Sequence, residues 1–150
     1  MNKYDKYKAR MEWKRAEQID KLKNRALSKQ SGYALIDHSY NVKEGIIKFS
    51  KGVTLEHLLA MTKVCYYLKR HNIKFYTELI FKKEYGIGRA DIFIPDKMIC
   101  VEILGSESIS KFKDIKLENY PLGLDIIPLQ AIDVLQNDFS LNNILYIQNK

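Results

Sequence analysis

Two carboxylates stand at mirrored positions of the segment GRADIFIPDKMICVEIL (residues 88–104), which otherwise has the pattern of a buried β-hairpin. If the turn is centred between Asp96 and Lys97, facing residues have numbers that sum to 193, so Asp91 faces Glu102. Facing side chains have Cβ atoms about 4.5–5.5 Å apart, and two carboxylates at that spacing repel each other unless a cation lies between them. The pair therefore has the chemistry of an oxygen-ligand site for Mg²⁺ or Mn²⁺.

Because side chains alternate across a strand, the predicted hairpin has two faces. Phe93 and Cys100 share the face of the two carboxylates. The other face is apolar throughout and comprises Ile92, Ile94, Ile99, Val101 and Ile103. A second interpretation exposes both carboxylates at the open end of the hairpin. It fits less well, because it exposes only these two positions of an otherwise apolar pattern.

A helix and several strands must position this pair. Thr54 is a favourable N-cap for a helix over residues 55–71. The predicted buried face of this helix comprises Leu55, Leu58, Leu59, Thr62, Cys65, Tyr66 and Leu68. Further strands are predicted for residues 74–81 and 124–132, a helix for residues 107–120, and two short strands around a turn for residues 33–52.

The order helix, strand, hairpin, helix, strand predicts an α/β fold in which helices flank a mixed central β-sheet. A chain of 150 residues with 46% hydrophobic residues suits one such domain. We expect this domain over residues 31–150 and a separate basic helix over residues 1–30.

These residues, in this order, resemble the PD-(D/E)XK, or restriction-endonuclease-like, nucleases. In that superfamily a helix with an acidic residue precedes three strands, an Asp starts the second strand, and an (Asp/Glu)-x-Lys motif lies on the third. Here Glu56, Asp91 in "RAD" and Glu102 in "VEIL" take these places. The resemblance covers about residues 54–129. It implies a restriction-endonuclease-like core that hydrolyses DNA with Mg²⁺ or Mn²⁺ as cofactor, held by Asp91 and Glu102.

Two further carboxylates are candidates for the same site. Glu56 would complete the metal shell if it follows the family pattern. Glu78, inside the strand segment FYTELIF, is a candidate third ligand or a residue that supports a ligand. Each is equally compatible with a solvated surface position, so the sequence leaves both alternatives open. The three histidines match no metal-binding spacing, and we assign them no role.

The lysine of the family motif is absent, and Leu104 stands in its place. In the family this lysine orients the attacking water or stabilises charge at the phosphorus, and some members supply it from the following helix. Helical geometry places Lys113 and Lys116 on the inward side of the helix predicted for residues 107–120, and Lys111 on the outer side. Either inward lysine is a candidate catalytic group. If neither reaches, the site binds metal without cutting.

The basic character of the chain is concentrated at its N-terminus. Residues 1–30 contain ten Lys or Arg and four Asp or Glu, a local excess of +6 within the +7 of the whole chain. This excess favours a polyanionic partner, for which we take DNA. The predicted contacts with the nucleic-acid backbone are Lys6, Lys8, Arg10, Lys14, Arg15, Lys21, Arg25 and, beyond the turn at residues 86–88, Arg89. The alternative is that the helix docks on the core or on a second subunit of a homodimer.

Several function classes are disfavoured. Cys65 and Cys100 match neither a disulfide framework nor a zinc motif, which indicates buried thiols in a reducing, cytoplasmic environment. No run approaches the roughly 18 apolar residues of a membrane span, and no nucleotide-binding fingerprint is present. The main alternative to an active nuclease is a catalytically inactive nuclease-like domain that binds nucleic acid or mediates protein assembly. A third alternative is an unrelated α/β interaction protein.

Overall fold

The computed structural model describes residues 2–26, 31–37, 39–40, 42–81, 88–115, 120 and 124–142. Its centre is a sheet with the strand order β1-β2-β3-β4, formed by β1 (Tyr76–Phe81), β2 (Gly88–Ile94), β3 (Ile99–Leu104) and β4 (Asp125–Gln130). The first three strands are antiparallel, and β4 runs parallel to β3. The predicted mixed sheet is therefore confirmed.

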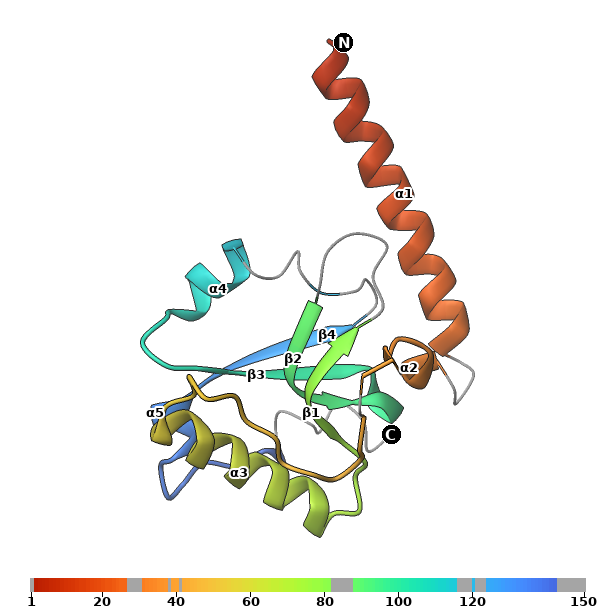
Figure 1. Ribbon diagram of the computed structural model, residues 1–150. Coiled ribbons are helices and arrows are strands. Elements are labelled where there is room, and N and C mark those ends of the chain that lie inside the picture. Colours follow the sequence, from red (N-terminus) through yellow and green to blue (C-terminus); the bar gives the residue numbers. More distant parts are fainter. Residues whose placement is uncertain are drawn as a thin grey trace.

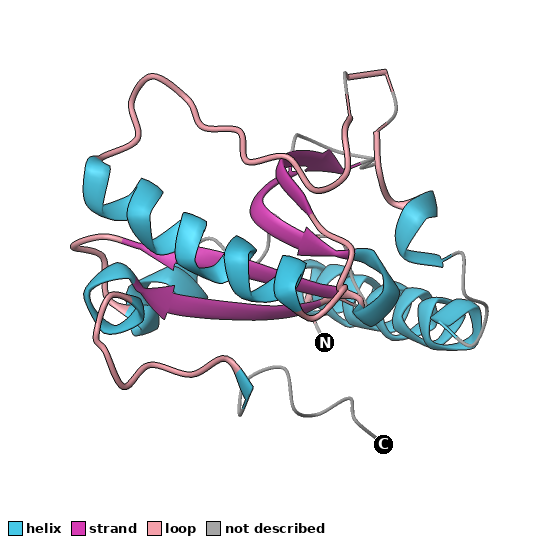
Figure 2. Ribbon diagram, turned by 90° about the horizontal axis from the view of Figure 1, so that it is seen from below, coloured by secondary structure: helices cyan, strands magenta, loops and turns pink. Residues whose placement is uncertain are grey.

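Helices cover both faces of this sheet (Figures 1 and 2). The described helices of the chain are α1 (Lys3–Ala26), α2 (Ser31–Ala34), α3 (Leu55–Arg70), α4 (Ile109–Ile115) and α5 (Ala131–Val134). Side chains of α3 and α5 form one core cluster with the sheet, and Phe112 of α4 belongs to a second cluster on the other side. The fold is thus a layered α/β arrangement, as predicted.

The hairpin of β2 and β3 has the predicted register. Its pairs are Ile92↔Val101, Phe93↔Cys100 and Ile94↔Ile99, so facing numbers sum to 193. A short 3₁₀ turn, η1 (Pro95–Lys97), joins the strands and ends at Met98, whose φ is 55°. The predicted division into two faces is also correct: the isoleucines and Val101 pack in the cluster with α3, and Phe93 and Cys100 pack in the other.

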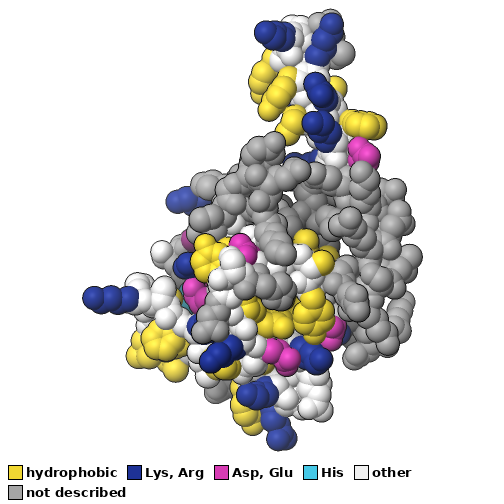
Figure 3. Space-filling view, turned by 45° about the vertical axis from the view of Figure 1, so that its right-hand side comes forward, with side chains coloured by type: hydrophobic (Ala, Val, Ile, Leu, Met, Phe, Trp, Pro, Cys, Tyr) yellow, Lys and Arg dark blue, Asp and Glu magenta, His cyan; other side chains and the backbone are white. Residues whose placement is uncertain are grey.

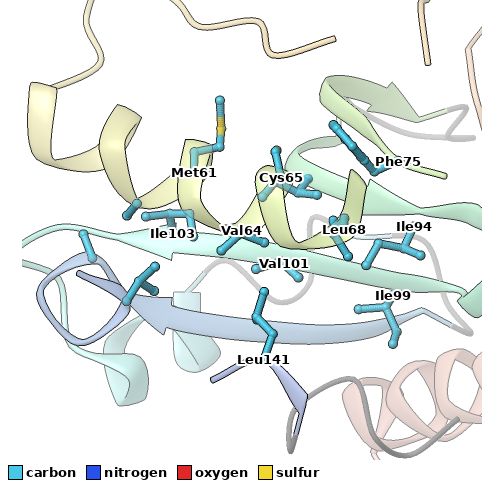
Figure 4. Close-up of a cluster of buried hydrophobic side chains, with 14 residues drawn as sticks. Met61, Val64, Cys65, Leu68, Phe75, Ile94, Ile99, Val101, Ile103 and Leu141 are labelled. Atoms are coloured by element: carbon cyan, nitrogen blue, oxygen red, sulfur yellow. The ribbon is translucent and has the colours of Figure 1, made fainter. Parts of the chain in front are cut away.

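Helix α3 begins as predicted, and its buried face agrees with the prediction only in part. The Thr54 side chain accepts a hydrogen bond from the backbone N–H of His57, which caps the helix. The buried residues are Ala60, Met61, Val64, Cys65 and Leu68 (Figure 4). Leu55, Leu59 and Tyr66 are exposed. Cys65 and Leu68 are thus buried as predicted. The rest of the predicted face was wrong because the larger leucines were given more weight than a stripe that contains a small residue and packs against the sheet.

In the described residues of the segment before α3, neither of the two predicted strands is present. Residues 31–34 form α2, and Ile36 makes an isolated bridge to Phe81. Further on, the hydroxyl of Thr77 accepts a hydrogen bond from the Lys48 backbone N–H and donates one to the Ile46 carbonyl. A buried side chain therefore satisfies the backbone groups that a strand ladder would otherwise pair.

Helix α1 projects away from the α/β body (Figure 1). Its apolar residues Tyr4, Tyr7, Met11 and Trp13 are exposed, and so are the predicted contact residues Lys6, Lys8, Arg10, Lys14 and Arg15 (Figure 3). The side chains of Lys21 and Arg25 lie outside the described residues. Among the helices that are described, none has the length and apolar character of a membrane span.

Candidate functional site

The sheet divides into two arms at Asp91 and Glu102. The β2–β3 ladder ends at the pair Ile92↔Val101. Beyond it, β2 stays paired with β1 as far as Gly88, and β3 stays paired with β4 as far as Leu104. Figure 1 shows the two arms running in different directions. The two carboxylates stand at this fork, where the strands separate.

Each carboxylate at the fork is held by the backbone of the opposite strand. The Asp91 backbone N–H donates to Oε1 of Glu102 at 3.1 Å, and the Ile103 N–H donates to Oδ2 of Asp91 at 2.8 Å. These two bonds replace the ladder bonds that the separating strands no longer make. They also fix both side chains, so the pair is preorganised by the fold.

Glu102 is the most perturbed of the described carboxyl groups. It is 9% exposed, and burial raises its pKa well above the usual range, with a further increase from the Asp91 charge. Hydrogen bonds from the Tyr120 hydroxyl and the Asp91 N–H act in the opposite direction. Burial and the charge of Glu102 in turn raise the pKa of Tyr120. A buried carboxyl that ionises only at a cost is the kind of group that a cation stabilises.

His57 also faces this site. Its Nε2 lies 3.6 Å from Oδ1 of Asp91, too far for a full hydrogen bond but within range of an ion pair. Nε2 is buried and has no hydrogen-bond partner among the described residues, and the Asp91 carboxylate raises the pKa of His57. We assigned His57 no role from the sequence. The missed signal is its spacing, because His57 extends the buried stripe of Ala60, Met61 and Val64 by one turn.

The predicted ligand Glu56 is not brought to the pair. It is exposed in the first turn of α3, about 100° around the helix from His57. In the described part of the chain, its carboxylate is not among the groups that contact Asp91 or Glu102. The predicted position of Glu56 at this site is therefore wrong, and the neighbouring residue His57 faces Asp91 instead.

The other predicted carboxylate, Glu78, does lie beside the pair. It stands opposite Asp91 on β1, and the β1–β2 ladder skips this position. Its φ of 51° is left-handed, which costs a non-glycine residue about 1 kcal/mol or more. Burial and the Asp91 charge raise the pKa of Glu78, whereas Arg89 and His57 lower it. Nη1 of Arg89, predicted to contact phosphate, lies 3.4 Å from Oε2 of Glu78.

The lysine that the family motif requires remains unplaced. Leu104 is 4% exposed and packs in the cluster with Phe112, so its side chain belongs to the core. Helix α4 is described as far as Ile115, and Lys111 on it is exposed. The side chain of Lys113 and the whole of Lys116 lie outside the described residues. Their predicted role stays a prediction.

A divalent cation fits this site through two protein ligands. Among the residues that the structure describes, no group of three or more His, Cys, Asp or Glu side chains is arranged to hold a metal ion. Mg²⁺ is commonly bound by one or two carboxylates, with water and substrate phosphate at its remaining positions. Asp91 and Glu102 supply such a pair, and a cation would relieve the repulsion between the buried Glu102 carboxyl and the half-buried Asp91 carboxylate.

The raised pKa of Glu102 predicts a pH-dependent effect of Mg²⁺ on stability. Without metal, the Glu102 carboxyl favours the folded state most at a pH below the ordinary pKa of a glutamate. This stabilisation is lost as the pH rises through the raised pKa of the folded protein, because the buried carboxyl must then ionise. Mg²⁺ replaces the proton, so at a hundredfold excess over Kd we expect it to raise Tm by about 5–10 °C near pH 8 and by less near pH 5.

Differential scanning fluorimetry across pH, with Mg²⁺ or with chelator, measures this effect. The pKa values of His57 and Glu78 are raised as well, so these groups also make Tm depend on pH. The difference in Tm between the unmodified protein and Glu102→Gln isolates the effect of Glu102. The exposed Glu44→Gln is the matched control and should behave as the unmodified protein. An equal response to Mg²⁺ in Glu102→Gln would exclude Glu102 as a ligand.

Comparisons of this chain with family models, with curated proteins and with solved structures gave no match. The resemblance to the PD-(D/E)XK nucleases therefore depends on the short motifs and on the order and arrangement of the elements that carry them.

Proposed function

We propose that this chain is a divalent-metal-dependent nuclease that hydrolyses phosphodiester bonds of DNA at the fork between β2 and β3. The observation that carries the proposal is the pair Asp91 and Glu102, two carboxylates fixed where the sheet divides. The order α3-β1-β2-β3-α4-β4 supports a restriction-endonuclease-like core, because it is the order that the resemblance implies.

In this proposal, Asp91 and Glu102 hold Mg²⁺ or Mn²⁺. The bound metal supplies an activated water and a positive charge beside the phosphoryl oxygens. The Asp91 and Ile103 N–H groups and the Tyr120 hydroxyl keep the ligand oxygens oriented. His57 is a positioning residue for Asp91, since it approaches the carboxylate oxygen that does not accept the Ile103 bond.

One observation favours the inactive nuclease-like domain instead. Leu104, at the position of the motif lysine, is part of the packed core. A domain without that cation would bind metal or nucleic acid and not cut. Nicking of supercoiled plasmid with Mg²⁺, with Mn²⁺ and with chelator separates the two functions. Metal-dependent nicking is expected, and its absence with every divalent metal would refute the nuclease proposal.

The relocated lysine yields a separate prediction for an active enzyme. We expect Lys113→Met or Lys116→Met to lower the single-turnover rate by about a hundredfold or more while DNA affinity changes little, because the lost contact is made in the transition state. Lys111→Met is the control, since Lys111 is exposed. Rates and affinities are measured on one substrate. Normal cleavage by all three variants would eliminate the relocated-lysine hypothesis.

A further inference from the structure

A cavity of about 240 Å³ lies beside the fork, between the segment 40–48 and strands β1 and β2. Its walls include three cationic side chains, those of Lys43, Lys48 and Arg89. Among the lining residues that the structure describes, Glu78 is the acidic one, and it pairs with Arg89. These described side chains carry more positive than negative charge, which suits an anionic ligand.

The cavity also has apolar and aromatic walls. Tyr40 and Tyr76 contribute rings, and Val42, Leu79 and Ile80 contribute aliphatic surface. At about 30 Å³ per water, the volume corresponds to roughly eight water molecules. This space accommodates a phosphate group with part of an attached nucleoside, and the combination of rings and cations matches those two parts.

One wall of the cavity is fixed by buried hydrogen bonds. Thr77 is 4% exposed, and its hydroxyl bonds to the Lys48 N–H at 2.7 Å and to the Ile46 carbonyl at 2.6 Å. These bonds fasten the segment that carries Lys43 and Lys48 to β1. The wall that carries Lys43 and Lys48 is thus part of the folded framework.

The cavity shares Glu78 with the fork, and the charge of Asp91 acts on Glu78. From this geometry we infer that the cavity binds the phosphate of a nucleotide that flanks the scissile bond of the substrate strand. Lys43 and Arg89 contact that phosphate, and Tyr40, about half exposed at the cavity, contacts its sugar or base. The position of this phosphate relative to the scissile bond rests on the proposed function. The binding of a nucleic-acid strand in the cavity does not.

The test measures binding without cleavage. Fluorescence anisotropy in chelator gives the affinity for a labelled 12-nucleotide oligo-dT strand, with inorganic phosphate as competitor. Lys43→Ala should lower the affinity about tenfold, as expected for the loss of one charged hydrogen bond. Lys51→Ala removes the same charge from an exposed lysine outside the cavity and should change the affinity less than twofold. Both variants should keep the unmodified Tm.

The outcomes separate this inference from the proposed function. Equal affinities of the two variants would overturn the inference, and so would an unmodified protein that binds no strand. A third result would also overturn it: inorganic phosphate competes with the strand, but Lys43→Ala binds the strand as tightly as the unmodified protein. The cavity would then bind free anions only. If no metal supports cleavage but Lys43→Ala alone loses affinity, the inference stands and the nuclease proposal fails.

Discussion

Replacing Asp91 by Asn is expected to lower the single-turnover rate of DNA cleavage about a thousandfold or more without unfolding the domain. The amide oxygen can still accept the Ile103 N–H, so the fork keeps that bond. The negative charge that binds the metal is lost, and a metal contributes several kcal/mol of transition-state stabilisation. Removal of one of two neighbouring carboxylates also lowers their repulsion, so Tm in chelator should be equal or higher.

Glu102→Gln should behave in the same way, since its amide oxygen can accept the Asp91 N–H. The matched control is Asp125→Asn, an exposed aspartate at the start of β4, which should cleave at the unmodified rate. Rates are measured with saturating protein and Mg²⁺, and the fold is checked by circular dichroism. Undiminished cleavage by either fork variant would refute the assignment of the metal ligands.

Neutralising four basic residues of α1 should weaken DNA binding by up to about a thousandfold at 0.1 M salt. At about 100° per residue, Tyr4, Tyr7 and Met11 lie on one side of this helix, and basic residues flank them on both sides. The helix projects into solvent, so these side chains are accessible to a long polyanion (Figure 3).

The variant replaces Lys8, Arg10, Lys14 and Arg15 by Gln. Each lost phosphate contact removes about 0.9 from the slope of log K against log salt on duplex DNA, so the slope should fall by about 3–4. A control with the same charge change replaces the exposed residues Lys51, Arg70, Lys74 and Lys111. Equal slopes in both variants would assign α1 to dimerisation or packing, which sedimentation velocity then tests.

The sequence alone determined the hairpin and its pairing. Alternation of apolar residues and one turn centre define which residues face each other, and β2 and β3 follow that rule over all three pairs. The N-cap of α3 is equally local, because Thr54 bonds to a backbone group three residues away. The mixed α/β class followed from the order of such elements. The hairpin and the N-cap could be predicted because the contacts that form them join residues close together in the sequence.

The buried stripe of α3 and the segment before it were decided by contacts between distant residues. More than one stripe of α3 is apolar enough to be buried, and packing against β3 selected the one that continues to His57. The segment 42–52 could have paired as strands, but the side chain of Thr77 bonds to two of its backbone groups instead, the Lys48 N–H and the Ile46 carbonyl.

The geometry of the fork depends most clearly on the tertiary structure. The sequence placed Asp91 opposite Glu102 and could not show that the ladder ends there, that Glu78 becomes left-handed beside them, or that Tyr120 reaches Glu102. Those outcomes depend on the pairing of β2 with β1 and of β3 with β4. The residue pattern within one hairpin contains no information about strands outside it. The residue types were thus readable in the sequence, and their burial, spacing and pKa were set by the assembled sheet.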